Sequence, residues 1–197
     1  MRLGKARLPF ATDEYDRAWG DQLVRAIDQN FDAIFADAAG AYSVNGYYGS
    51  FYDTTDQTAA AINTPYAMTF NSTALASQVA MIDGSKITFK IRGLYSLQFV
   101  AQLDQTAGGA QNIYVWIRKN NVDVAQSATK ISLQGIGWGV GGSAAAAPSW
   151  NFVVSVLSED YIQIMWATDN TGAFLSASAA TAFCPAIPSV AVTVVTI

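Results

Sequence analysis

Carboxylates are the side chains of this sequence that could carry chemistry. Past residue 45 the acidic residues are Asp53, Asp56, Asp83, Asp104, Asp123, Glu159, Asp160 and Asp169. A glycosidase needs two carboxyl groups that face each other at a defined separation. Most of these acids stand in turn-like contexts, where an aspartate usually accepts hydrogen bonds from nearby backbone amides. We therefore predict no catalytic residue and a protein that is not an enzyme.

Nucleophiles and metal ligands are scarce. The sequence has no histidine and one cysteine, Cys184, which excludes Ser-His and Cys-His pairs and a zinc framework. It also lacks the dense Asp-x-Asp-x-Asp run of an EF-hand loop. We therefore expect no metal site and no cofactor. Cys184 precedes Pro185 with no basic neighbour to activate it, which predicts a small buried hydrophobe.

Charge is rare and unevenly distributed. Charged residues make up 13% of the 197 residues, about half of the roughly 25% typical of soluble domains. Residues 1–37 carry five basic and seven acidic side chains, whereas the other 160 residues carry 14 charges. The net charge of −4 and the lack of a basic patch argue against nucleic-acid binding. The sequence also predicts no secretory signal and no membrane span. A body so poor in charge predicts surface buried against a partner, most simply in a homo-oligomer.

The N-terminal 45 residues predict a polar tail and an amphipathic helix. Thr12 or Asp13 can cap the helix, and Gly40 can end it, which gives a helix over about 13–39. Its apolar stripe repeats at heptad-like spacing. The stripe consists of Tyr15, Trp19, Leu23, Val24, Ile27, Phe31, Ile34 and Phe35. This face either packs on its own domain, pairs within an oligomer or docks onto another protein, and we favour an intermolecular anchor.

After Gly46 the sequence predicts an all-β sandwich. Short runs rich in Val, Ile, Thr, Tyr and Phe alternate with clusters of Gly, Ser, Asn and Asp. The predicted strands cover residues 47–52, 58–62, 66–70, 78–82, 86–91, 94–103, 112–119, 122–126, 150–157, 161–167 and 190–196. Asn120 and Asn121 predict a tight hairpin turn. Residues 129–149 are rich in glycine and alanine and predict a long loop.

Aromatic residues have two interpretations. Rings near strand starts in a sandwich are mostly core or subunit-interface residues. The candidates for the core or an interface are Tyr95, Phe99, Tyr114, Trp116, Tyr161 and Trp166. A ring on an exposed loop or strand start can instead stack on a ligand, and the candidates for such a ligand surface are Tyr47, Tyr48 and Trp138.

Four motifs carry a family resemblance over about residues 46–197. They are residues 93–99 (GLYSLQF), 113–121 (IYVWIRKNN), 157–164 (LSEDYIQI) and 187–190 (IPSV). In this order they resemble the motifs of the C1q/TNF-like jelly roll, in the version found in bacteriophage virion proteins. Two residues depart from the pattern, because Asn121 and Glu159 stand where the family usually has glycine.

The resemblance implies a ten-stranded antiparallel jelly roll that forms a compact homotrimer. It also implies a non-enzymatic structural protein of the virion, such as a capsid decoration, a spike or a tail appendage, with capsid or tail proteins as partners. The N-terminal segment would then be the anchor and residues 46–197 the exposed head. The alternative is an adhesin module that binds a host surface or a carbohydrate through the head.

Overall fold

The chain divides into two compact units, Met1–Asn45 and Gly46–Ile197. The computed structural model describes residues 23–28, 46–106, 108–135 and 145–197. Residues 23–28 are helical, inside the predicted helix, with Leu23 half-buried and Val24 and Ile27 exposed. The rest of the predicted helix face lies outside the described residues, and so does Trp138. The helix-face residues that lie outside the described residues are Tyr15, Trp19, Phe31, Ile34 and Phe35. The role of residues 1–45 as an anchor stays a prediction.

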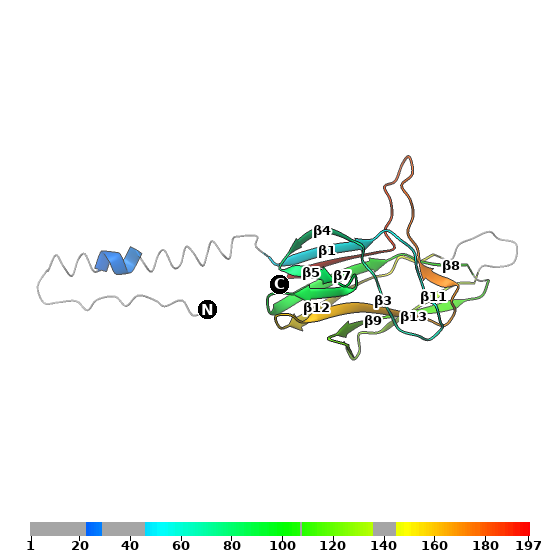
Figure 1. Ribbon diagram of the computed structural model, residues 1–197, viewed down its shortest axis with the longest axis horizontal. Coiled ribbons are helices and arrows are strands. Elements are labelled where there is room, and N and C mark those ends of the chain that lie inside the picture. Colours follow the sequence, from blue (N-terminus) through cyan, green and yellow to red (C-terminus); the bar gives the residue numbers. More distant parts are fainter. Residues whose placement is uncertain (1–22, 29–45, 107, 136–144) are drawn as a thin grey trace, which may run out of the picture. The chain divides into compact units, whose positions relative to one another are not determined.

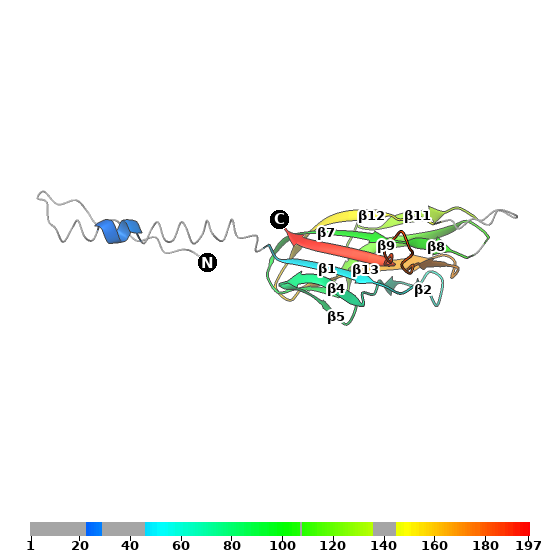
Figure 2. The same ribbon diagram turned by 90° about the horizontal axis from the view of Figure 1, so that it is seen from above.

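Two antiparallel sheets and a small third sheet make up the second unit. The five-stranded sheet has the order β12 (Ser149–Val156), β7 (Gly93–Ala101), β15 (Val190–Thr196), β1 (Tyr48–Asp53) and β4 (Ser72–Ser77). The seven-stranded sheet has the order β10 (Val122–Asp123), β9 (Gln111–Lys119), β13 (Tyr161–Thr168), β6 (Lys86–Phe89) and β5 (Val79–Ile82), with β11 (Thr129–Leu133) paired to β9 and β3 (Tyr66–Ala67) paired to β13. The third sheet contains β2 (Gln57–Thr58), β14 (Ala173–Leu175) and β8 (Leu103–Gln105). Figure 2 shows β7, β15, β1 and β4 side by side.

The strand pairs are nested, which defines the fold as a jelly roll. The outermost pair is β1 with β15, followed inward along the chain by β6 with β13, β7 with β12 and β9 with β11. Successive pairs alternate between the five-stranded and the seven-stranded sheet. This double-sheet arrangement is the jelly-roll solution to closing an antiparallel sandwich. The predicted antiparallel jelly-roll sandwich is therefore confirmed, although the described strands number 15 rather than ten.

The core lies between the two large sheets and follows strand alternation. Along β7, Tyr95, Leu97 and Phe99 are buried, while Gln98 between them is exposed. Because successive side chains of a strand point to opposite faces, this pattern places every second residue in the core. The phenyl ring of Phe89 packs against the ring of Tyr95, with centroids 4.7 Å apart. Apolar alternation in the sequence therefore identifies the inward face of this strand correctly.

Four strands were not predicted: β4, β8, β11 and β14. The expectation of a loop over residues 129–149 is wrong at its start, because Thr129–Leu133 forms β11 along the edge of β9. An edge strand exposes one face, and here Lys130 and Ser132 are exposed while Leu133 is buried. Strand β4 is also an edge strand, and apart from Leu75 its side chains are small. In β4 this leaves little of the apolar, β-branched signal by which strands are recognised. In β11, Ile131 and Leu133 do alternate with polar residues, but the glycine-rich stretch that follows makes the segment resemble a loop.

Two turns require left-handed backbone at the positions where the family motifs usually have glycine. Asn120 and Asn121 have φ of 48° and 65°, and they connect β9 to β10 with Lys119 opposite Val122. This is the predicted tight hairpin turn, in which both central residues need positive φ. Glu159, in the turn between β12 and β13, has φ of 67°. The two departures from the motif have thus kept the backbone conformation that glycine favours.

Replacing Glu159 by glycine is expected to stabilise the domain. A side chain in the left-handed region costs about 1–2 kcal/mol, which glycine avoids. The change also removes an exposed ion pair of 3.2 Å between Glu159 and Lys90, which contributes little at the surface. We expect a net gain of about 0.5–1 kcal/mol in the free energy of unfolding, measured by urea denaturation. Glu159→Ala, which keeps a Cβ, is the control and should show no gain.

Asp160 ties this turn to the β9–β10 hairpin. Its Oδ2 lies 2.8 Å from Lys119 Nζ and accepts the Leu157 backbone N–H at 2.7 Å, while Asn120 Nδ2 donates to its Oδ1 at 2.7 Å. The hydrogen bond from Lys119 and then those from Leu157 and Asn120 lower the pKa of Asp160 from 3.8 to about 2. The carboxylate therefore stabilises the folded state in its ionised form.

Lowering the pH should remove the stabilisation that the ionised Asp160 provides. Because the folded pKa lies below the unfolded one, the stabilisation is complete above about pH 4 and is lost as the pH falls toward 2. We expect Asp160→Asn to destabilise the protein by about 1–2 kcal/mol at pH 7, the larger part of which disappears at pH 2. Urea melts at a series of pH values measure this. An equal loss at both pH values would contradict the assignment.

Candidate interaction surfaces

The outer face of the five-stranded sheet has no charged side chain. Asp53 is the one charged residue among all residues of β1, β4, β7, β12 and β15, and its side chain is buried. The outward positions carry uncharged polar groups such as Gln98 and Thr193 and exposed aliphatic groups such as Val153 and Val195. Because charged residues are depleted at the centres of protein interfaces, this composition fits a surface that a protein partner covers.

The outer face of the seven-stranded sheet is different. Lys86, Arg118, Asp123 and Lys130 all lie at outward positions of its strands. Charged side chains of both signs are typical of a surface that stays in water. The charged outer face of the seven-stranded sheet is therefore suited to contact with water. The uncharged outer face of the five-stranded sheet is the candidate surface for contact between subunits.

A short aromatic row lies on the charged side of the sandwich. Tyr114 is exposed and Trp116 is half-buried at alternate positions of β9. The Trp116 indole N–H donates to Asp123 Oδ1 at 2.8 Å, and Arg118 Nε lies 2.7 Å from the same oxygen. These two bonds lower the pKa of Asp123, that from Arg118 most. The carboxylate thus holds both side chains in place on the outer face.

The predicted aromatic candidates separate by face. Tyr95, Phe99 and Trp166 lie in the core of their own domain. Tyr114, Trp116 and Tyr161 lie on the outer face of the seven-stranded sheet, where Lys86 Nζ is 5.4 Å from the Tyr161 ring centroid. Of the candidate ligand-surface residues, Tyr47 packs against the core, and Tyr48 is partly exposed on the outward side of β1.

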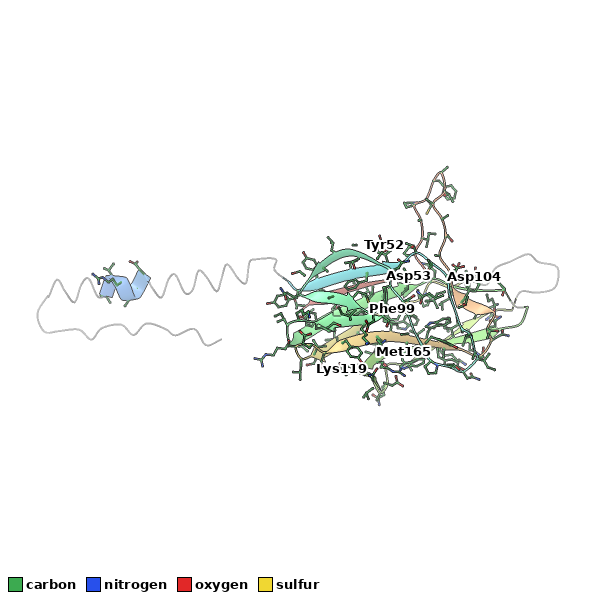
Figure 3. The ribbon with its side chains drawn as sticks, viewed as in Figure 1. Tyr52, Asp53, Phe99, Asp104, Lys119 and Met165 are labelled. Atoms are coloured by element: carbon green, nitrogen blue, oxygen red, sulfur yellow. The ribbon has the colours of Figure 1, made fainter. Side chains whose placement is uncertain are left out.

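Asp53 is a structural carboxylate. It is 2% exposed and accepts hydrogen bonds from Thr55 N, Thr55 Oγ1, Thr69 Oγ1 and Asn71 Nδ2, at distances between 2.6 and 3.1 Å. The network joins the end of β1 to the segment that leads into β4. Because all of these donors bond to it, the Asp53 carboxylate serves as a hydrogen-bond acceptor that stabilises the fold. Figure 3 shows Asp53 beside Tyr52 at the end of β1.

Replacing Asp53 by alanine should be strongly destabilising. Four donor atoms, from Thr55, Thr69 and Asn71, would lose their buried carboxylate acceptor, and a hydrogen bond to a charged group contributes about 1.5–3 kcal/mol. We expect a loss of about 3–4 kcal/mol in the free energy of unfolding, measured by chemical denaturation. Asp56→Ala, whose carboxylate is exposed and accepts the Ala177 N–H, is the matched control and should cost about 1 kcal/mol. Equal losses in the two variants would contradict the role assigned to the Asp53 network.

Other titratable groups form no cluster that suggests catalysis. Across residues 23–28, 46–106, 108–135 and 145–197, no group of three or more His, Cys, Asp or Glu residues could hold a metal ion. The expectation that Cys184 is buried is wrong. It lies half-exposed between β14 and β15 because that connection stands out from the domain instead of entering the core.

Comparisons with known proteins give structural neighbours and no relatives by sequence. No family model and no curated protein match the chain. Murine APRIL, solved as a crystal structure at pH 8.0, has a TM-score of 0.49 and 12% identity over 77% of this chain and 99% of its own. The globular domain of zebrafish complement 1qA protein has a TM-score of 0.42 and 14% identity over 77% of this chain and 97% of its own. The jelly-roll assignment rests on the nested strand pairs. Within the part of the chain that the structure describes, no helix is long and apolar enough to cross a membrane.

Proposed function

We propose that this protein is a non-enzymatic structural subunit of a bacteriophage particle that assembles as a homotrimer. The uncharged outer face of the five-stranded sheet carries the proposal, because it offers a continuous surface suited to burial against copies of the same chain. The proposed trimeric state and the proposed place in a phage particle rest on the sequence motifs that resemble those of C1q/TNF-like virion domains. Capsid decoration, a spike and a tail appendage are the positions that such a subunit would occupy.

Light scattering coupled to size-exclusion chromatography tests the assembly. We expect a stable species of three times the 21.0 kDa subunit mass at micromolar concentration. A stable species at the subunit mass would overturn the proposed trimer.

Attachment to the particle is assigned to residues 1–45. Deleting residues 1–42 should leave a folded trimer that no longer joins the particle, which sedimentation with stripped particles detects. Phe31→Asp in the full chain places a carboxylate in the predicted apolar stripe and should cause the same loss, because an unpaired buried charge costs several kcal/mol. If the truncated head still joins particles, attachment runs through the jelly roll. Unfolding of the truncated head would show that the segment belongs to the head's own core.

A second candidate function is carbohydrate binding by the head. The observation that favours it is the row of Tyr114 and Trp116 on β9, with the indole fixed by Asp123. Immobilised aromatic faces beside polar side chains suit the stacking of an amphipathic ring. Glycan arrays with the full chain and with Trp116→Ala test this candidate, and Tyr48→Ala on the opposite sheet is the control. Binding that Trp116→Ala abolishes and Tyr48→Ala leaves would establish it.

A further inference from the structure

The connection between β14 and β15 forms an arm that stands out from the domain (Figure 1). The arm, residues 176–189, contains no charged residue. Its two sides are joined by backbone hydrogen bonds of 2.9 Å in both directions between Ser178 and Ile187, and Thr181 N donates to Cys184 O at 2.8 Å across the tip. Phe183 at the tip is 91% exposed. A phenylalanine so exposed on a hydrogen-bonded arm is a knob that no other part of the described chain covers.

The base of the arm is fixed to the body. Ser176 N donates to Gln102 O at 2.8 Å, Ala177 N to Asp56 Oδ1 at 2.7 Å and Ser189 N to Asp53 O at 2.9 Å. These bonds anchor both ends of the arm to the body. The arm is therefore already placed before any partner arrives, which lowers the entropy cost of binding.

A notch of about 690 Å³ lies between the arm and the end of β1. The arm contributes small apolar side chains, including Ala179, Pro185 and Ala186, and the body contributes Tyr52, Thr54 and Asp56. This volume is within the range of about 300–1,000 Å³ that is usual for pockets that bind small groups, so the notch has room for a phenyl ring. Asp56, the charged residue of the lining, already accepts a backbone hydrogen bond from Ala177.

The notch continues the uncharged face. Tyr52 lies at an outward position of β1, the strand beside the central strand β15 of the five-stranded sheet. Figure 3 shows Tyr52 at the end of β1 beside the base of the arm. A subunit that packs on the uncharged face is therefore adjacent to the notch.

We propose that the arm tip of each subunit docks into the notch of the next subunit, with Phe183 as the knob, so that a second copy of this chain occupies the notch. The inference rests on the proposed trimer and names its contact. Phe183 does not fill the notch of its own chain, since it is exposed. A knob and a notch at different places on one chain form a head-to-tail contact, and three such contacts close a ring under threefold symmetry. Each docked phenylalanine buries about 150–250 Å².

The first experiment compares Phe183→Ser with Val122→Ser, which removes a similarly exposed apolar side chain from the β9–β10 hairpin. Sedimentation equilibrium gives the concentration at which half of each protein is trimeric. Phe183→Ser should raise that concentration at least tenfold, and Val122→Ser should not change it. Both variants change exposed residues, so the circular dichroism spectrum of the head should stay the same. If the unaltered chain is monomeric, the proposed trimer itself fails. If the chain is trimeric and the two variants behave alike, the trimer stands and the arm contact is overturned.

The second experiment locates the tip. Cys184 follows Phe183, and Thr54 lines the notch, so Thr54→Cys should form a disulfide between neighbouring subunits under mild oxidation, with linked dimers and trimers on a non-reducing gel. Such a bond needs Cα atoms within about 7 Å. Thr54→Cys combined with Cys184→Ser should give no linked species, and Val122→Cys controls for random collision. A trimer that Phe183→Ser weakens, but that forms no linked species with Thr54→Cys, places the tip elsewhere on the neighbour and overturns the contact with the notch.

Discussion

The Gln98→Glu chain is expected to be monomeric at concentrations at which the unaltered chain is trimeric. Gln98 is exposed at an outward position in the middle of β7, next to the central strand β15, and lies opposite Thr193. Glutamate has the same shape and adds one negative charge to a face that has none. Each trimer would bury three unpaired carboxylates at about 3–5 kcal/mol each. The concentration for half-assembly should rise more than about 100-fold.

Two variants control this prediction. Gln126→Glu adds the same charge at an exposed position on the segment after β10 and should leave the trimer intact. Gln98→Leu removes the amide without adding charge and should also assemble. Sedimentation equilibrium measures all three proteins, and thermal melts of the monomeric fractions verify that the fold is kept. A trimer that tolerates Gln98→Glu as well as Gln126→Glu would exclude this face from the interface.

The strands that the sequence predicts best are those with a continuous apolar face or with apolar side chains along most of their length. Predictions over 112–119, 161–167 and 190–196 agree with β9, β13 and β15 to within one residue at each end. Prediction fails at the edge strands β4 and β11, whose residues give a weak apolar signal or run into a loop-like stretch, although the more apolar edge strands β5 and β12 are found. In β11, Lys130 and Ser132 alternate with Ile131 and Leu133, and the glycine-rich stretch that follows makes the whole segment resemble a loop.

Surfaces are harder to predict than strands. The low charge of residues 46–197 predicts that some surface is buried, but strand alternation does not tell which sheet supplies it. In β9 both faces are apolar or aromatic, since Ile113, Val115 and Ile117 alternate with Tyr114 and Trp116. Nothing in that run distinguishes core from surface, and the packing of Ile113, Val115 and Ile117 in the core of the sandwich makes the difference. The arm is missed for a similar reason, because a run of alanine, serine and proline predicts a connection between strands but not how far that connection projects.

The largest expected loss of subunit stability comes from Phe99→Ala. Phe99 points into the sandwich from β7, with its ring centroid 5.1 Å from that of Trp150 and 6.3 Å from that of Phe152, both on the neighbouring strand β12. Truncation removes the ring that packs against both neighbours and leaves a cavity in a close-packed core. Phe→Ala changes of this kind cost about 3–5 kcal/mol, so the free energy of unfolding should fall by that amount.

Tyr114→Ala is the matched control, since Tyr114 lies on the outer face of β9. Surface truncations usually change stability by less than about 1 kcal/mol. Urea denaturation at several protein concentrations separates the two possible roles of Phe99. A core residue lowers the stability of the subunit at every concentration, including those at which the Gln98→Glu chain is monomeric. If Phe99→Ala leaves the Gln98→Glu monomer as stable as before and weakens the trimer alone, the ring belongs to the subunit interface and its place in the core is wrong.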